Sequence, residues 1–151
     1  MEHSYIMIKP EGVKRRLVGE LIKRFETKGY KLTAMKMVKP TMEILREHYA
    51  EHVNKPFFPG LAKHFTSGSV ICMIWSGKNC VAGCRKIIGA TNPFNAECGS
   101  IRSDFCNDTG RNIIHGSDSV ESAKREISIW FKEGFDYEDA YDQDLIYDLN
   151  E

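Results

Sequence analysis

The segment Ser69-Val70-Ile71-Cys72-Met73-Ile74-Trp75 is the strongest strand signal in the chain. Its run from Val70 to Trp75 contains no polar residue that would face water, which predicts a strand buried on both faces. We therefore expect this strand in the centre of a sheet, with the other elements arranged around it.

Three weaker apolar runs predict the partners of the central strand. They cover Tyr5–Ile8, Tyr30–Val38 and Asn112–His115. The first run stops at Lys9-Pro10-Glu11-Gly12, which is turn-like because a proline cannot continue a central strand. The chain thus supplies four strands.

Between these strands, apolar residues recur at the spacing of amphipathic helices. In the first such segment Leu21 and Phe25 share one face, and Gly29 stands where a helix commonly ends. In the last, Asp118 followed by Glu121 forms a capping-box pattern. The predicted helices span residues 18–29, 41–49, 61–68, 81–89 and 118–130.

Length and composition are those of one globular domain. The chain has 151 residues, of which 42% are hydrophobic and 28% charged, and this excludes disordered, collagen-like and disulfide-scaffold classes. Residues 90–111 are rich in Gly, Asn, Asp and Ser without a period, which predicts a long loop of the kind that carries function. The element order favours an α/β sandwich in which one four-stranded sheet is covered by helices.

Charge and cysteine content narrow the possible partners and the compartment. Lys and Arg total 21 and Asp and Glu total 21, so no overall basic field would draw the protein to nucleic acid. The N-terminus lacks the apolar stretch of a signal peptide or membrane span, so we expect no membrane partner. Five cysteines without a CxxC pair suit a reducing compartment, and we expect a cytoplasmic protein. We assign the cysteines no chemistry.

The segment Gly110-Arg111-Asn112-Ile113-Ile114-His115-Gly116-Ser117-Asp118-Ser119 is the most informative for chemistry. It places His115 at the end of an apolar strand, one glycine before a helix N-terminus. Such an N-terminus binds phosphate and disfavours a protonated ring, so a neutral, nucleophilic imidazole is expected there. From local sequence alone, a histidine that only hydrogen-bonds its neighbours in the core is equally compatible.

Three cations stand where a phosphate could be held, namely Lys9, Arg85 and Arg102. Taken singly, each is better explained as solvated surface charge, and only convergence in space would change that. No P-loop or dinucleotide-binding glycine motif is present. His48 and His52 have the spacing of a zincin pair but lack its glutamate, so two surface histidines are expected instead.

Four segments together resemble the nucleoside diphosphate kinase family, over roughly residues 4–131. They are Ile8-Lys9-Pro10-Glu11-Gly12-Val13, Pro56-Phe57-Phe58, Thr91-Asn92-Pro93 and Asn112-Ile113-Ile114-His115-Gly116-Ser117-Asp118-Ser119. The resemblance implies a ferredoxin-like βαββαβ core with a four-stranded antiparallel sheet. It also implies a ping-pong reaction in which the γ-phosphate of a nucleoside triphosphate, typically ATP, passes through a phosphohistidine to a nucleoside diphosphate, with broad base and sugar specificity.

The resemblance also implies roles for individual residues. His115 resembles the phosphorylated nucleophile, Glu126 the carboxylate that orients its ring with support from Ser119, and Tyr49 a tyrosine near the transferred phosphate. The binding positions that match are Arg85, Thr91 and Arg102 for the phosphates, Lys9 and Asn112 for the ribose, with Lys9 also close to the phosphates, and Phe57, Leu61 and Thr109 for the base.

Cofactor and assembly are likewise implied. Mg²⁺ would arrive on the nucleotide phosphates without direct protein ligands, with Asp118 touching it through water. A homohexamer is expected, with a tetramer as the alternative. Thr109, Ala90 and Phe94 depart from the family pattern, and residues 132–151 form a divergent tail on a single domain of residues 1–151. The competing hypothesis is a nucleotide or single-stranded nucleic-acid binding module on the same fold, although the balanced charge argues against nucleic acid as a primary partner.

Overall fold

The computed structural model describes residues 1–137, 143–148 and 150. Its strands are β1 (Glu2–Ile8), β2 (Lys31–Val38), β3 (Val70–Gly77) and β4 (Ile114–Gly116). Its α-helices are α1 (Pro10–Lys14), α2 (Val18–Lys28), α3 (Met42–His48), α4 (Phe58–Thr66), α5 (Cys80–Ile88), α6 (Ile101–Phe105), α7 (Val120–Trp130) and α8 (Gln143–Ile146). Short 3-10 turns are η1 (Ala50–His52), η2 (Pro93–Asn95) and η3 (Thr109–Arg111).

The four strands form one antiparallel sheet in the order β2-β3-β1-β4. With crossover helices after β1 and β3, this is the ferredoxin-like βαββαβ arrangement, into which α3 and α4 are inserted between β2 and β3. Every residue of β3 is buried and the strand has a neighbour on each side, which confirms its predicted central position. The fold class is therefore α+β, with an antiparallel sheet despite the alternation of strands and helices.

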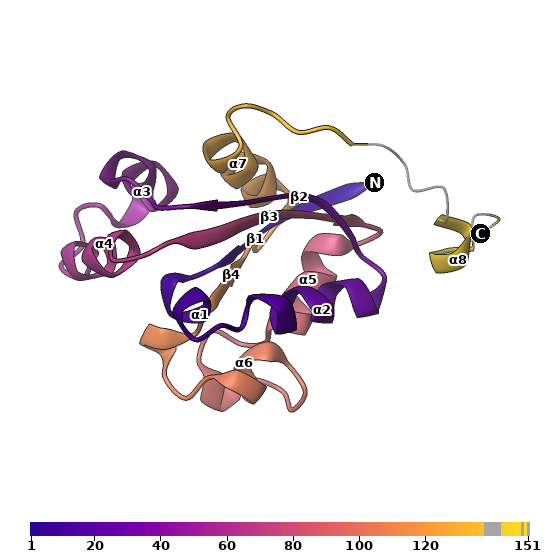
Figure 1. Cartoon of the computed structure of the whole chain (residues 1–151), viewed down its shortest axis with the longest axis horizontal. Coiled ribbons are helices and arrows are strands. Elements are labelled where there is room, and N and C mark those ends of the chain that lie inside the picture. The colour runs from indigo at the N-terminus through magenta and orange to yellow at the C-terminus, as the bar shows by residue number, and fades with distance from the viewer. Residues whose placement is uncertain (138–142, 149, 151) are drawn as a thin grey trace.

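Helices cover both faces of the sheet, and each face has its own core (Figure 1). On one face, α2, α5 and α6 pack against the strands, and the rings of Phe25 and Trp75 lie 5.2 Å apart. On the other, α3, α4 and α7 pack around Tyr5 and Trp130, whose rings stack at 5.9 Å. Strand β1 contributes alternate residues to both cores, because successive side chains of a strand point to opposite faces.

The predicted loop of residues 90–111 is more ordered than its composition suggested, because it contains η2, α6 and η3. Each of these elements begins with a side-chain cap, from Asn92, Ser100 and Asp108 respectively. In the sequence such small polar residues are typical of loops. Here their side chains accept hydrogen bonds from backbone N–H groups and so begin short helices. In the same way, the predicted turn after Lys9 is the single-turn helix α1, with Pro10 at its first position.

Two boundaries near His115 also differ from the prediction. Strand β4 begins at Ile114 rather than Asn112, because Ile113 has a positive φ of 60° and cannot join the ladder. Helix α7 is capped by the Ser119 side chain, which accepts a hydrogen bond from the Ser122 N–H, and not by Asp118. His115 nevertheless lies on β4 and pairs with Met7 of β1.

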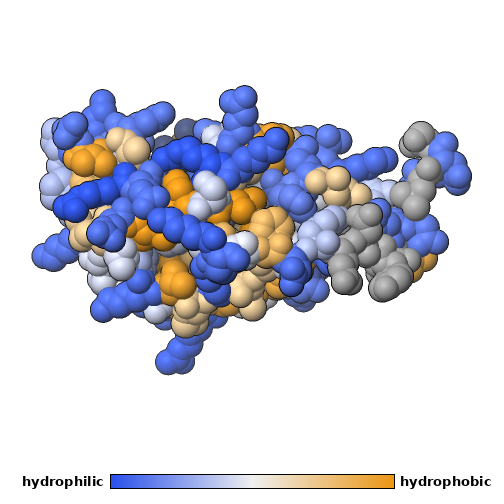
Figure 2. Space-filling model, turned by 90° about the horizontal axis from the view of Figure 1, so that it is seen from above, coloured by the Kyte–Doolittle hydropathy of each residue, from blue (hydrophilic) through white to orange (hydrophobic). Residues whose placement is uncertain are grey.

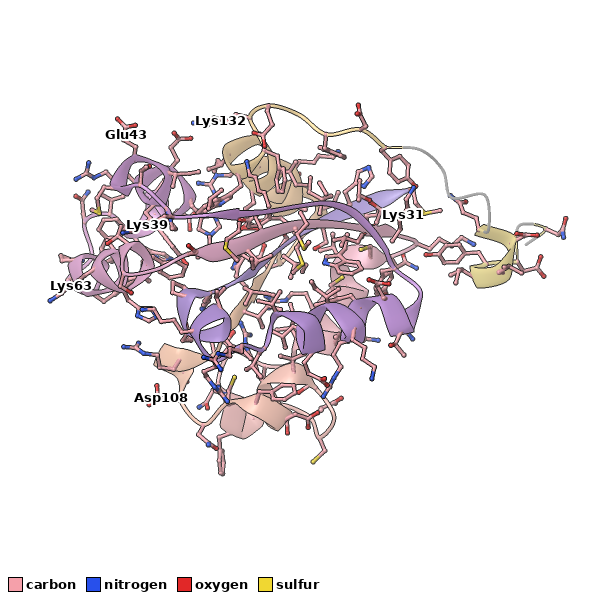
Figure 3. All side chains as sticks on the ribbon, in the orientation of Figure 1. Lys31, Lys39, Glu43, Lys63, Asp108 and Lys132 are labelled. Atoms are coloured by element: carbon pink, nitrogen blue, oxygen red, sulfur yellow. The ribbon has the colours of Figure 1, made fainter. Side chains whose placement is uncertain are left out.

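Strand β2 is an edge strand with apolar side chains at the surface. Met35 and Met37 are 51% and 61% exposed. Seen from above, the surface of the molecule shows apolar residues scattered among charged ones (Figure 2). Elsewhere, charged side chains such as Lys39, Glu43, Lys63, Asp108 and Lys132 point outward on different sides (Figure 3), consistent with the balanced net charge.

The predicted tail falls partly on residues 138–142, 149 and 151, which lie outside the described residues. Of its described part, Tyr147 returns to the end of β3, where its hydroxyl accepts a hydrogen bond from the Lys78 N–H at 2.9 Å. Among the described residues, no helix combines the length and apolar character needed to cross a membrane.

Candidate active site

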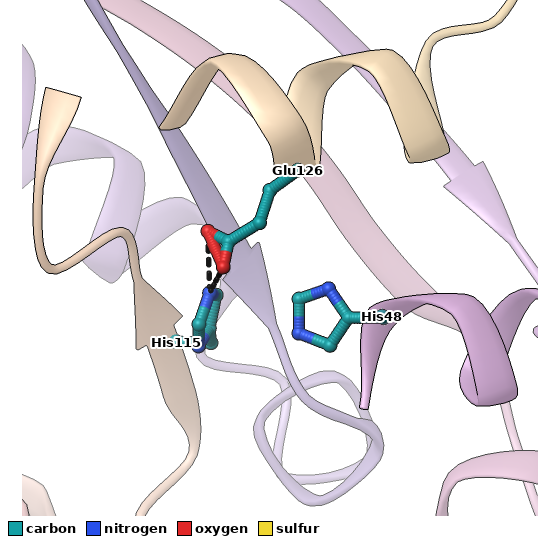
Figure 4. A group of neighbouring side chains, drawn as sticks. All are labelled: His48, His115 and Glu126. Atoms are coloured by element: carbon teal, nitrogen blue, oxygen red, sulfur yellow. Dashed lines mark hydrogen bonds and ion pairs between the residues drawn. The ribbon is translucent and has the colours of Figure 1, made fainter. Parts of the chain in front are cut away.

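The imidazole of His115 is oriented by a carboxylate on the neighbouring helix. Its Nε2 lies 3.0 and 3.1 Å from the two carboxylate oxygens of Glu126, which α7 carries across from β4 (Figure 4). Burial alone would raise the pKa of Glu126, but the hydrogen bonds and charge from His115 and a hydrogen bond from Ser117 outweigh it and lower that pKa. An ionised carboxylate can only accept, so Nε2 carries the proton and Nδ1 keeps its lone pair. Nδ1 is therefore the ring nitrogen with a free lone pair.

The hydroxyl that supports Glu126 belongs to Ser117, and the prediction for Ser119 is wrong in this respect. Ser117 Oγ donates to Glu126 Oε1 at 2.6 Å and is buried, whereas Ser119 caps α7. The reason is geometric. Ser117 directly follows β4 and lies next to Glu126 of α7, where it also hydrogen-bonds with the Tyr5 backbone. The signal that would have identified it is a serine two residues after His115, since side chains two apart in extended backbone share a face.

His48 packs beside the ring of His115 and is not the surface histidine that was predicted. It is 7% exposed, and its ring stands at 79° to that of His115 with centroids 5.0 Å apart. The indole N–H of Trp130 donates to His48 Nδ1 at 3.0 Å, so the proton of a neutral His48 lies on Nε2. Burial, followed by the proximity of His115, lowers the pKa of His48 to about 3, and the ring stays uncharged at neutral pH.

Lys9 and Asn112 are hydrogen-bonded to each other near the start of the strand that carries His115. Lys9 Nζ donates to Asn112 Oδ1 at 2.7 Å, and Asn112 Nδ2 donates to the Thr91 carbonyl at 3.0 Å. Burial lowers the pKa of Lys9 to about 8, although the carboxylate of Glu11 opposes the shift. Three residues from distant parts of the sequence are thereby joined in one chain of hydrogen bonds.

The two arginines also converge on this region. Arg102 is only 5% exposed and donates to the carbonyls of Asn112 (3.4 Å), Gly89 (3.2 Å) and Ile114 (2.6 Å). Arg85 donates to the carbonyl of Gly116 at 3.3 Å. Burial, followed by the charge of Arg85, lowers the pKa of Arg102 to about 10, which still leaves it cationic at neutral pH. The convergence in space that the sequence left open is therefore present.

The remaining predicted residues lie outside this hydrogen-bonded cluster. Phe57 starts α4, is 53% exposed and contacts the ring of His52 at 5.4 Å, while Leu61 is partly buried on the same helix. Thr109 is exposed at the start of η3. Tyr49 ends α3 with its ring 4.6 Å from that of His48, and burial raises its pKa.

Within the described part of the chain, His48, His115 and Glu126 offer ligand atoms that lie within 4.8 Å of one another. This set does not suit Mg²⁺, which prefers oxygen ligands and keeps several waters. Moreover, Trp130 and Glu126 already engage one nitrogen of each histidine. Asp118 is exposed and offers a carboxylate whose pKa is lowered, chiefly by a hydrogen bond from Ser122. The cluster thus fits a cation that is carried by phosphates rather than one held by a protein cage.

Comparison with known proteins agrees with this geometry. The family model described as nucleoside diphosphate kinase matches residues 2–135. A relative from Cyanothece sp. with the name nucleoside diphosphate kinase is 56% identical over 132 residues, which cover 87% of this chain and 89% of the relative.

Solved structures of similar proteins extend the match to the fold. Nucleoside diphosphate kinase from Encephalitozoon cuniculi has a TM-score of 0.93 and 46% identity, covering 97% of this chain and 100% of that one. A halophilic nucleoside diphosphate kinase from Halobacterium salinarum, solved in complex with CDP, has a TM-score of 0.91 and 40% identity, covering 97% and 98%. These findings confirm the resemblance read from the sequence and favour an enzyme over a binding module. The chain belongs to the nucleoside diphosphate kinase family of phosphotransferases.

Proposed function

We propose that His115 is the residue that carries the phosphoryl group in a two-step transfer between nucleotides. In the first step, the Nδ1 lone pair attacks the γ-phosphorus of a nucleoside triphosphate, and the bond to the β-phosphate oxygen breaks. The nucleoside diphosphate leaves with that electron pair. In the second step, a terminal phosphate oxygen of another nucleoside diphosphate attacks the phosphohistidine, and the N–P bond breaks to restore Nδ1. The contact that supports this most directly is the bond between His115 Nε2 and Glu126.

The cations around His115 suit the charge that such a transfer develops. Arg102 and Lys9 contact the turn before His115, and Arg85 contacts the glycine after it. Fixed cations stabilise the equatorial oxygens of a phosphoryl group during its transfer. We assign Arg85, Arg102 and Thr91 to the phosphates, Lys9 and Asn112 to the ribose hydroxyls, with Lys9 also reaching the phosphates, and Tyr49 to the neighbourhood of the transferred group.

The base is assigned to the exposed rim of the site. Phe57 offers a π face, and every base can stack on such a face, so broad base specificity follows. Leu61 lies one helical turn further along α4, and we assign Thr109 to the opposite side of the base. A threonine there makes the clamp on the base wetter than an aliphatic residue would.

Mg²⁺ is the proposed cofactor. Bound to the nucleotide phosphates, it neutralises their charge and orients the γ-phosphoryl group. Asp118 is the residue of this chain that would contact it, through water.

We further propose a cytoplasmic homo-oligomer, a hexamer in preference to a tetramer. Met35 and Met37 are exposed on β2, which lies at the edge of the sheet and pairs only with β3 among the described strands. They support self-association, because apolar edge strands are usually covered by another part of the protein or by a partner.

Intact-mass measurement tests the central assignment. After brief exposure to ATP and Mg²⁺, the wild-type chain is expected to gain one phosphate, and a chase with a different nucleoside diphosphate is expected to remove it. His115→Ala should form no adduct while it still binds nucleotide. His3→Gln, which changes a histidine near the start of β1, is the matched control and should behave as wild type. Retention of the adduct in His115→Ala would overturn the assignment, and binding without any adduct in the wild type would indicate a nucleotide-binding module.

A further inference from the structure

The backbone immediately before His115 is strained. Ile113 has a φ of 60°, in the left-handed region that a β-branched residue rarely adopts. Across it, the Ile114 N–H donates to the Asn112 carbonyl at 2.8 Å and closes a tight three-residue turn. The turn joins Asn112, whose side chain binds Lys9, to the strand that carries His115. A strained conformation persists only where the surroundings determine it.

The three carbonyls of this turn and its Ile113 N–H have partners elsewhere in the fold. Arg102 holds the carbonyls of Asn112 and Ile114, and the Lys9 N–H donates to the Ile113 carbonyl at 2.8 Å. The remaining group, the Ile113 N–H, donates to a side chain, Oε2 of Glu11, at 3.3 Å.

Glu11 is itself held in place from a third direction. It is only 8% exposed, and its Oε1 lies 2.9 Å from Nε2 of His64 on α4. The close approach of α1 requires a glycine next to it, since a Cβ on Gly12 would lie 2.7 Å from the Ile8 side chain and 3.0 Å from the Ile113 carbonyl. Glu11 is not among the residues that are assigned to the phosphates, the ribose or the base.

We propose that Glu11 is a positioning residue for phosphoryl transfer, whose carboxylate, held by His64, fixes the Ile113 turn and through it the placement of His115. The proposal rests on the proposed function of His115. Strand β4 has only three residues, so its ladder with β1 sets the position of His115 weakly, and the turn supplies the missing constraint. Misplacement of a reacting group by about 1 Å costs roughly 100-fold in rate, so a partial release of the turn is measurable.

Phosphorylation of His115 by phosphoramidate isolates this effect, because this small donor needs neither the ribose nor the base contacts. The rate is followed by intact mass at a temperature where circular dichroism shows each variant to be folded. For Glu11→Ala we expect a rate about 10-fold below wild type. Glu11→Gln keeps an acceptor for the Ile113 N–H and should recover to within about 2-fold of wild type.

Two further variants keep the test decisive. His64→Phe leaves Glu11 in place but unsupported, and should slow phosphorylation by about 3-fold even if Glu11→Ala does not fold. Thr33→Val removes a hydrogen bond to Ser76 near the far end of the sheet, and should lower thermal stability without changing the rate.

The possible outcomes distinguish the function proposed for His115 from the positioning role proposed for Glu11. If wild type takes up no phosphate from phosphoramidate or ATP, the function proposed for His115 fails. If wild type is phosphorylated and both Glu11→Ala and His64→Phe react at its rate, the positioning role fails while the function stands. If Glu11→Gln is as slow as Glu11→Ala, the charge of Glu11 matters rather than its bond to the turn, and the proposal is again overturned.

Discussion

The two ends of the candidate site are built in opposite ways. At the proposed phosphate end, Arg102 and Glu126 are buried and are held by directed hydrogen bonds. At the base end, Phe57 is 53% exposed and Thr109 lies in solvent. Charge that moves during a reaction is stabilised only by groups that are already in position, whereas stacking on a ring needs little more than access. The contrast predicts that phosphoryl transfer depends strongly on the positions of buried groups, whereas different bases are bound with little discrimination.

The largest effect is expected at the buried end, from Arg102→Met. The substitution removes a cation and takes one hydrogen-bond donor away from each of three carbonyls. We expect kcat/KM to fall by at least about 100-fold and the free energy of unfolding to fall by about 3 kcal/mol, measured by steady-state kinetics and urea unfolding. Arg102→Lys is the control: it keeps the charge but lacks the planar fork, so it should recover little of either. Full recovery of kcat/KM and of the free energy of unfolding in Arg102→Lys would show that the charge of residue 102 is sufficient and that the geometry of its hydrogen bonds is not needed.

An intermediate effect is expected from pH, through Lys9. Its pKa is lowered to about 8 by burial, so the cation is lost as the pH rises above that value. We expect the dissociation constant for a nucleoside diphosphate, measured by calorimetry, to rise about 5-fold between pH 8 and pH 9. Lys9→Met should remove this dependence, and a flat profile in the wild type would contradict the assignment of Lys9 to the nucleotide.

The same shift has a defined sign for stability. Between pH 8 and 10.5, an unfolded chain still holds a proton on Lys9 that the folded chain has released. Because the unfolded state binds more protons, the Lys9 contribution to the free energy of unfolding rises with pH across this window. Nucleotide affinity and this stability contribution should therefore change in opposite directions.

The smallest effect is expected at the open end, from Phe57→Ala. Loss of the stacking face should raise KM by about 10-fold, similarly for purine and pyrimidine nucleotides, with kcat within about 2-fold of wild type. Thr109→Val, which restores an aliphatic residue, should lower KM by no more than about 2-fold. If Phe57→Ala changed kcat as much as Arg102→Met does, the two ends of the site would not act independently, which would contradict the contrast drawn above.

Much of the fold was predictable because it depends on local patterns. The apolar run at Val70–Trp75 predicted a central strand and the structure confirms it. The segment around His115 was specific enough to identify the family. Predictions were wrong for residue types that can take either of two structural roles. Small polar residues in 90–111 cap helices instead of forming an open loop, and His48 turns inward because Trp130 offers it a hydrogen bond.

The sequence by itself determined the order of strands and helices, the family and the identity of the candidate nucleophile, because each depends on residues that are neighbours in the chain. The tertiary structure decided that Ser117 rather than Ser119 supports Glu126, which nitrogen of His115 is free, and that Glu11 bonds to a turn more than 100 residues away. These contacts join segments whose separation in space no local pattern encodes. Burial then decides their effect, because removal from water strengthens each hydrogen bond and shifts the pKa of Lys9 and His48.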